Sequence, residues 1–197
     1  MQYRIDKEGL LREIGDWNDF LKRKVKFIAC GGTALTLLNV KESTKDIDLL
    51  IPRVDEYNYL IKILTDLGYQ PVTGSGWSRK GGFIFDLFPG KKIHTTELLE
   101  SPLKKGNYFP IKEYSHIFLG ALNHYDLIIS KLFRGTSVDF EDCLALFKKK
   151  GNEIDIEKLK KRYSETASYD VSKERVNKQF DSFMGMLKNG EIYNESE

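Results

Sequence analysis

The chain has 197 residues, of which 41% are apolar and 30% are charged, and this composition is typical of a folded globular protein and excludes a disordered one. The formal net charge is +2, from 31 basic and 29 acidic residues, so the overall charge neither requires nor excludes a nucleic-acid partner. The sequence shows no signal-peptide pattern and no apolar stretch of membrane-spanning length. We therefore expect a cytoplasmic protein without a membrane partner.

Helical and strand patterns alternate in the first third of the chain. Apolar residues at three- and four-residue spacings, and short apolar runs between them, predict helices over residues 7–24, 34–39 and 55–67 and strands over 25–30 and 47–51. Gly31 and Gly32 are expected to end the first strand, and Thr33 is expected to cap the short helix that follows.

The rest of the chain changes from strand to helix patterns. Short strands are predicted over residues 69–72, 77–80 and 83–88, mixed strands and loops over 91–114, and helices over 125–133, 138–149, 156–163 and 171–187. The predicted fold class is α+β: a mixed sheet flanked by helices and followed by a helical segment. Two parts are expected: a core with its N-terminal helix over residues 1–115, and the helical segment over residues 116–197.

Two aspartates interrupt the apolar strand near residue 47. Alternate residues of a strand point to the same side, so Asp46 and Asp48 are expected to project together. Two nearby carboxylates repel each other unless a cation or a proton lies between them. The pair therefore suits a hard divalent cation, although an Asp-x-Asp sequence by itself is equally well explained by a turn residue followed by an exposed strand residue.

A third carboxylate lies in another apolar strand pattern, FIFDLFPG. Asp86 in this run is either bonded to nearby backbone or bound to a metal, because a lone buried carboxylate is unfavourable. If its strand lies beside that of Asp46 and Asp48, the three carboxylates converge. Such a triad can hold two metal ions and activate a hydroxyl for attack on a phosphate.

The sequence GGTAL at residues 31–35, followed by STKDIDL at residues 43–49, resembles the nucleotidyltransferase superfamily with the DNA polymerase β-like fold. The AbiEii-type toxin nucleotidyltransferases and their relatives are the branch that it resembles most. The second residue of the glycine turn is Ser in many members of the superfamily, and here it is Gly32.

A second block, HYDLIISKLFRGTSVDFEDCLALF at residues 124–147, also resembles the pattern of that branch. The residues that match it are Asp126, Lys131, Arg134, Asp139 and Asp142. The resemblance implies that Lys131 contacts the triphosphate, that Arg134 also binds nucleotide, and that Asp139 or Asp142 orients one of them. Without the resemblance, the pairs that share a helix face, Lys131 with Arg134 and Asp139 with Asp142, would be interpreted as exposed helical residues with ordinary charge partners.

The resemblance implies a metal-dependent enzyme that transfers a nucleoside monophosphate from a nucleoside triphosphate to a hydroxyl group. Asp46, Asp48 and Asp86 would bind Mg²⁺ or Mn²⁺ and act in catalysis. The nucleotide would be bound by Gly31, Gly32, Thr33, Lys131 and Arg134, with Lys45, Asp139 and Asp142 in support. The acceptor is open among RNA, protein and a small molecule. A toxin role in a toxin–antitoxin or phage-defence system, with a cognate antitoxin, also follows from the resemblance.

Two alternatives to an enzyme remain. The first is a non-catalytic protein with the same fold that binds nucleotide or RNA. The second is a partner-binding protein that docks through the apolar stripe of its last helix. That stripe is more often part of a core, and it consists of Val176, Phe180, Phe183, Met184 and Leu187.

Overall fold

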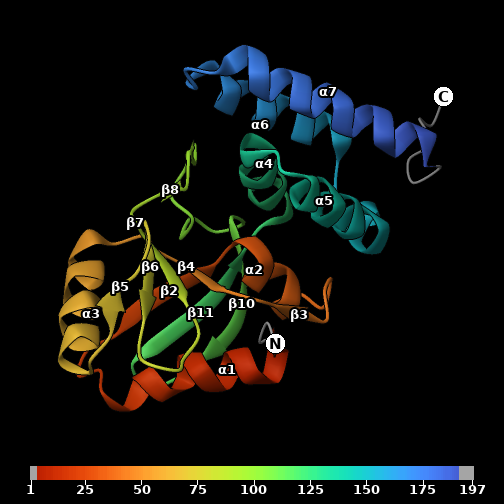
Figure 1. Cartoon of the computed structure of the whole chain (residues 1–197). Coiled ribbons are helices and arrows are strands. Elements are labelled where there is room, and N and C mark those ends of the chain that lie inside the picture. The colour runs from red at the N-terminus through yellow and green to blue at the C-terminus, as the bar shows by residue number, and fades with distance from the viewer. Residues whose placement is uncertain (1–3, 191–197) are drawn as a thin grey trace.

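Short apolar runs form the centre of the fold, a seven-stranded mixed sheet with helices packed on it (Figure 1). The computed structural model describes residues 4–190. From one edge to the other the strands are β10 (Tyr108–Glu113), β11 (Ile117–Leu122), β2 (Val25–Ala29), β4 (Ile47–Ile51), β7 (Phe85–Pro89), β6 (Gly76–Ser78) and β5 (Gln70–Pro71). Two short pairs lie outside it, β1 (Ile5–Asp6) with β3 (Ser43–Thr44) and β8 (Lys92–Ile93) with β9 (Thr96–Glu97). The predicted α+β class is confirmed.

The directions of the three central strands determine where the candidate site forms. β4 runs antiparallel to β2 and parallel to β7. The carboxyl end of β2 therefore lies beside the beginning of β4, and the beginnings of β4 and β7 are neighbours. Three segments therefore meet at this end of the central strands: the residues that follow β2, the first residues of β4 and the first residues of β7.

One central strand was not expected from the sequence. β11 lies between β10 and β2, pairs with β2 in parallel, and is buried along most of its length. Its sequence, IFLGAL, is a continuous apolar run without alternation, which is typical of a strand covered on both faces. The boundary expected at residue 115 falls in the loop between β10 and β11, so the sheet is completed only at Leu122 and the helical segment begins at His124.

The helices that cover the sheet are α1 (Lys7–Asp16), α2 (Gly31–Leu37) and α3 (Val54–Asp66). The helix expected over residues 7–24 ends at Asp16 and continues only as a 3₁₀ turn, Trp17–Asp19. The turn is held by tertiary contacts: the indole N–H of Trp17 donates to Tyr69 at 3.2 Å, and the Asn18 side chain accepts from the backbone of His116 at 2.8 Å. These contacts direct the chain into β2.

Four helices form a separate layer beside one end of the sheet: α4 (His124–Arg134), α5 (Ser137–Lys150), α6 (Ile156–Ser168) and α7 (Lys173–Asn189) (Figure 1). Capping side chains begin the first three: Asn123, Thr136 and Asp155 each accept a hydrogen bond from the third residue beyond them. A short 3₁₀ turn, Gly151–Glu153, connects α5 to α6.

The apolar stripe of α7 faces this helical layer rather than solvent. Val176, Phe183 and Leu187 are buried, and Phe180 and Met184 are partly buried against the same core. The Phe180 ring stacks on Tyr163 with centroids 4.3 Å apart. The stripe is therefore part of the core, and the hypothesis that it is a docking surface is wrong. Within residues 4–190, no helix has the length and apolar character that crossing a membrane requires.

Candidate active site

Two of the three predicted carboxylates lie side by side on neighbouring strands. Asp48 of β4 pairs in register with Asp86 of β7 in the parallel ladder. Asp46 precedes β4 by one residue and is exposed, whereas Asp48 is only partly exposed. All three line one cavity of about 390 Å³. The convergence predicted from the sequence is thus a consequence of the parallel pairing of β4 and β7.

The glycine pair follows β2 and lies against the same carboxylates. It opens α2 instead of preceding it: the helix begins at Gly31, and Cys30 occupies the N-cap position without a side-chain bond. Gly31 has a φ of 53°, and a Cβ added there would overlap Oδ2 of Asp48. A Cβ at Gly32 would lie 2.5 Å from Oγ1 of Thr44. Both positions therefore need glycine because other side chains already occupy the space.

Thr33 connects α2 to the Asp-x-Asp segment. Its side chain is fully buried, donates to the carbonyl of Asp46 at 3.1 Å, and accepts from the backbone N–H of Asp48 at 2.8 Å. Gly32 N–H points at Oδ2 of Asp48 at 3.2 Å. Gly32 lines the cavity, but Gly31 and Thr33 do not. Thr33 therefore holds the backbone between the two aspartates.

Lys131 of α4 is a buried residue that lines the side of the cavity opposite the three carboxylates. Its side chain is 3% exposed, and Nζ lies 2.7 Å from Asp142 and 3.5 Å from Asp139. Asp142 of α5 accepts a second ammonium group, that of Lys41, at 2.6 Å. Lys41 lies in the loop after α2 and lines the same cavity. One buried carboxylate thus holds two lysines from different parts of the chain.

Arg134, at the last residue of α4, is held by the capping structure of the next helix. Gly135 ends α4 in the left-handed conformation, and Thr136 and Asp139 form a capping box at the start of α5. The Asp139 carboxylate also accepts two hydrogen bonds from Arg134, at 2.8 and 2.5 Å. Asp139 thus contacts Arg134 and Asp142 contacts Lys131, and the expectation that Asp139 or Asp142 orients one of these cations stays a prediction.

The two sides of the cavity have opposite electrostatic character. Burial, and then the negative charge of Asp86, raise the pKa of Asp48 to about 6, and the same two causes raise the pKa of Asp46. Burial also opposes the ionisation of Asp139, but hydrogen bonds from Arg134 and Thr136 outweigh it and lower the pKa of Asp139 to about 2. The acidic side is therefore short of positive charge, whereas on the basic side Lys41, Lys131 and Arg134 each contact a buried carboxylate.

The donor set on the acidic side suits a hard divalent cation. It consists of carboxylate oxygens only, and the repulsion that raises the pKa of Asp48 would be relieved by a bound cation. The carboxylates do not form a closed ligand group, because within residues 4–190 no three His, Cys, Asp or Glu side chains are placed so that they could hold a metal ion. The carboxylates of Asp46, Asp48 and Asp86 thus suit a metal ion that takes its remaining ligands from outside the protein.

The structure adds residues to this cavity that sequence reasoning missed. They include Lys41, Arg4, Thr44, Glu141 and His94, and Ser75 donates to Asp86 Oδ1 at 2.8 Å. His94 has a φ of 50° and faces the guanidinium of Arg134, with the two nitrogens 3.2 Å apart. Thr44 and Glu141 lie within the two blocks that resemble the family but were not singled out there, and Arg4, Lys41, Ser75 and His94 belong to no pattern that would have indicated them. Lys45 is exposed and lines the cavity as expected.

Asp126 matches the family pattern but lies outside the cavity. It is 2% exposed, and its two oxygens accept from Nε and Nη2 of Arg162 at 2.7 and 2.8 Å. This bidentate pair joins α4 to α6. Asp126 therefore has a structural partner within the helical layer.

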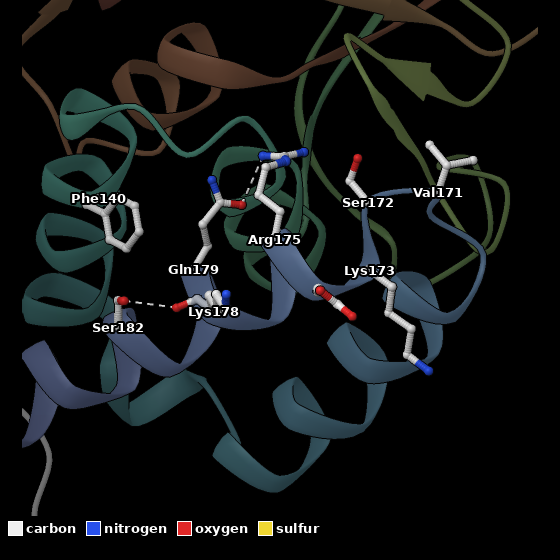
Figure 2. Close-up of a pocket in the computed structure, with 9 residues that line it drawn as sticks. Phe140, Val171, Ser172, Lys173, Arg175, Lys178, Gln179 and Ser182 are labelled. Carbon is white, nitrogen blue, oxygen red and sulfur yellow. Dashed lines mark hydrogen bonds between the residues drawn. The ribbon is translucent and has the colours of Figure 1, made fainter.

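A larger cavity of about 860 Å³ lies where the first part of α7 and the segment before it meet α5 (Figure 2). Phe140 of α5 and the first turns of α7 line it, and Arg175 donates to Gln179 at 3.2 Å across one side. Glu174 is the only acidic residue of this lining. The cavity has no pair of carboxylates, so it lacks the chemistry of the cavity at Asp48.

The chain was compared with known protein families. The family model described as "Nucleotidyltransferase of unknown function (DUF6036)" matches residues 109–189. This range contains Lys131, Arg134, Asp139 and Asp142, and it lies C-terminal to the three carboxylates. No curated protein matches the chain.

Among solved structures, the crystal structure of ANT(2")-Ia in complex with adenylyl-2"-tobramycin matches 90% of this chain and 94% of its own chain, with 15% identity and a TM-score of 0.41. That score is too low to be evidence about this chain. The family match supports a nucleotidyltransferase enzyme, on the part of the chain that carries the basic side of the cavity.

Proposed function

We propose that this protein is a metal-dependent nucleotidyltransferase that transfers a nucleoside monophosphate from a nucleoside triphosphate to a hydroxyl group. One observation supports this proposal above all: Asp46, Asp48 and Asp86 line the same cavity as Lys131 and Arg134. An acidic side can hold a divalent cation, and a basic side can hold phosphate oxygens. A nucleoside triphosphate with its metal ions needs both.

The proposed metal ligands are Asp46, Asp48 and Asp86, and the proposed ion is Mg²⁺ or Mn²⁺. When bound there, the metal would neutralise phosphate charge and stabilise the pyrophosphate leaving group. Gly31 keeps the space beside the Asp48 carboxylate free of a side chain, and Gly32 does the same beside Thr44. The Thr33 hydroxyl accepts from the backbone N–H of Asp48 and so fixes the backbone at that residue.

On the opposite side, Lys131 and Arg134 are proposed to bind the β- and γ-phosphates. Both side chains are already ordered by buried partners, Lys131 by Asp142 and Arg134 by Asp139. Cations fixed in place before the substrate arrives stabilise charge without a further ordering cost. Lys45 lies beside Asp46 and adds positive charge at the entrance.

The transfer step requires removal of one proton from the acceptor. The acceptor oxygen forms a bond to the α-phosphorus, the bond from that phosphorus to the bridging oxygen breaks, and pyrophosphate leaves. Asp86 is proposed to take the hydroxyl proton. Its Oδ1 accepts from Ser75, which leaves Oδ2 as the oxygen for that proton.

The acceptor within this proposal is an RNA end, a protein side chain or a small molecule. Assignment to the AbiEii-like branch, and with it a toxin role and a cognate antitoxin, depends on the motif resemblance and is part of the proposal. Inducible expression in a bacterial host tests the toxin role, since growth arrest that disappears in Asp48→Asn is expected. Growth unchanged by expression of the active protein would contradict it.

A second candidate is a protein that binds nucleotide or RNA without catalysis. The observation that favours it is the absence, within residues 4–190, of three acidic, His or Cys side chains placed to hold a metal ion. The two candidates differ in whether pyrophosphate is released.

The test is calorimetry with each common nucleoside triphosphate and Mg²⁺ or Mn²⁺, followed by a pyrophosphate-release assay with the nucleotide that binds. Asp48→Asn is expected to abolish both signals. Asp66→Asn, which alters an exposed aspartate at the end of α3, is the matched control and is expected to change neither. Nucleotide binding without pyrophosphate release, whichever acceptor is supplied, would favour the second candidate. No binding of any nucleoside triphosphate would refute the enzyme and would leave RNA binding as the only form of the second candidate.

A further inference from the structure

The loop after α2 brings a lysine into the cavity that no motif indicates. Lys41 lies 90 residues before Lys131 in the chain, yet both ammonium groups contact the carboxylate of Asp142, at 2.6 and 2.7 Å. Both side chains line the cavity that contains Asp48. The two lysines therefore form one cationic group around a single acceptor.

Cations outnumber the buried carboxylates on this side of the cavity. Three cations, Lys41, Lys131 and Arg134, share two buried carboxylates, Asp139 and Asp142. The carboxylate of Glu141 also lines the cavity but is exposed to solvent. An anion that lies along this side would complete the pairing.

We propose that Lys41 is a second ammonium ligand of the triphosphate tail, held beside Lys131 by Asp142. This inference depends on the proposed function. A lysine acts as a compact charge on a flexible stem, which suits contact with phosphate oxygens at variable positions. Two such charges in one place favour a chain of phosphates over a single one.

The exposures of the two side chains separate their roles. The Lys41 side chain is 26% exposed, whereas that of Lys131 is 3% exposed. Lys41 is thus the group at the mouth of the cavity, where the terminal phosphate of the tail would lie. Lys131 is the deeper group, nearer to the bond that breaks.

The experiment measures binding of inorganic tripolyphosphate and of pyrophosphate, each with Mg²⁺, by calorimetry. Lys41→Met is expected to weaken tripolyphosphate binding about tenfold or more and pyrophosphate binding by a smaller factor, because the shorter anion does not need the outer charge. Lys41→Gln, which keeps a hydrogen-bond donor for Asp142, is the second variant and is expected to show the same selective loss. Lys41→Arg is expected to recover most of the affinity.

Lys149→Met is the matched control. Lys149 donates to the carbonyl of Asn39 at 3.1 Å, so it contacts the same loop but does not line the cavity at Asp48. Its removal deletes one positive charge close to Lys41 and is expected to change tripolyphosphate affinity less than twofold. A loss equal to that of Lys41→Met would mean that general surface charge, not Lys41, attracts the anion, and would overturn the inference.

Failure of the inference and failure of the proposed function give different results. If the unaltered protein binds nucleoside triphosphate and Lys131→Met weakens binding but Lys41→Met and Lys41→Gln do not, Lys41 is not a phosphate ligand and the proposed function stands. If the unaltered protein binds neither tripolyphosphate nor any nucleoside triphosphate, the proposed function fails and the inference fails with it.

Discussion

The charge of Asp48 should destabilise the protein when no metal is bound. Its carboxylate packs against Gly31 and lies in register with Asp86. Burial, and then the negative charge of Asp86, raise the pKa of Asp48 from 3.8 to about 6. Asp48→Asn keeps the shape and an amide oxygen that can accept from Gly32 N–H, but it removes the charge. We therefore expect Asp48→Asn to raise the free energy of unfolding when no metal is bound, although Asp48 lies at the centre of the site.

The size of the effect follows from the shift in pKa. A rise of about two units corresponds to about 3 kcal/mol of unfavourable free energy for the ionised carboxylate in the native state. Because the pKa is raised on folding, the native state binds the proton more readily than the unfolded state between pH 3.8 and about 6. Asp48→Asn should thus stabilise by up to about 3 kcal/mol at pH 8, and this difference should vanish below about pH 4.

The assay is urea denaturation of both proteins in the presence of a metal chelator at pH 8, 6 and 4. Asp139→Asn is the internal comparison, because it is the same chemical change at a carboxylate whose pKa is lowered to about 2 by Arg134 and Thr136 against the effect of burial. Ionised Asp139 stabilises the native state above its unfolded pKa. Its replacement should therefore destabilise at pH 8 by about 2 kcal/mol or more, and less as the pH falls toward 2.

Opposite signs for the two substitutions at pH 8 would support the electrostatic account of the cavity. A destabilised Asp48→Asn at pH 8, or a difference that does not change between pH 8 and pH 4, would refute it. Addition of Mg²⁺ should then stabilise the original protein but not Asp48→Asn, since a bound ion removes the repulsion.

Three further predictions concern the supports of the site. Gly31→Ala should destabilise by about 1–2 kcal/mol from its left-handed backbone alone and should abolish metal-dependent nucleotide binding, because the new Cβ overlaps the Asp48 carboxylate; unchanged calorimetric affinity would contradict this. Thr33→Val, which leaves two buried backbone groups without their hydroxyl partner, should lower the unfolding free energy by about 1–3 kcal/mol, and Thr33→Ser should restore most of it. Arg162→Met should lower it by about 3–5 kcal/mol, because Asp126 would remain buried and unpaired, and a loss below 1 kcal/mol in thermal unfolding would show that the pair contributes little.

Several features of the fold could be predicted from local sequence. The strands at residues 25–29 and 47–51 and the four C-terminal helices follow from apolar runs and periodicity, and three of those helices begin at Asn, Thr or Asp caps. These signals depend on residues within about four positions of one another, and the sequence displays them directly. Strand patterns also indicated Asp46, Asp48 and Asp86 one by one, but their convergence was expected only if the strand of Asp86 lies beside that of Asp48, and the pairing of β4 with β7 decided this.

Other features depended on pairing across long stretches of chain. β11 is an apolar run typical of a buried strand, but its place between β10 and β2 comes from the order of the strands. Thr33 was expected to cap a helix, but its hydroxyl bonds to the segment on either side of Ile47, which β4 brings against α2.

The sequence by itself therefore determined the α+β class, most of the elements and the acidic residues of the candidate site. The tertiary structure alone decided that Lys41 and Lys131 share Asp142, that Asp126 pairs with Arg162, and that Gly31 must leave room for Asp48. The physical reason is that a buried charge needs a partner, and the chain can supply it from any distance along the sequence once folding has brought the elements together.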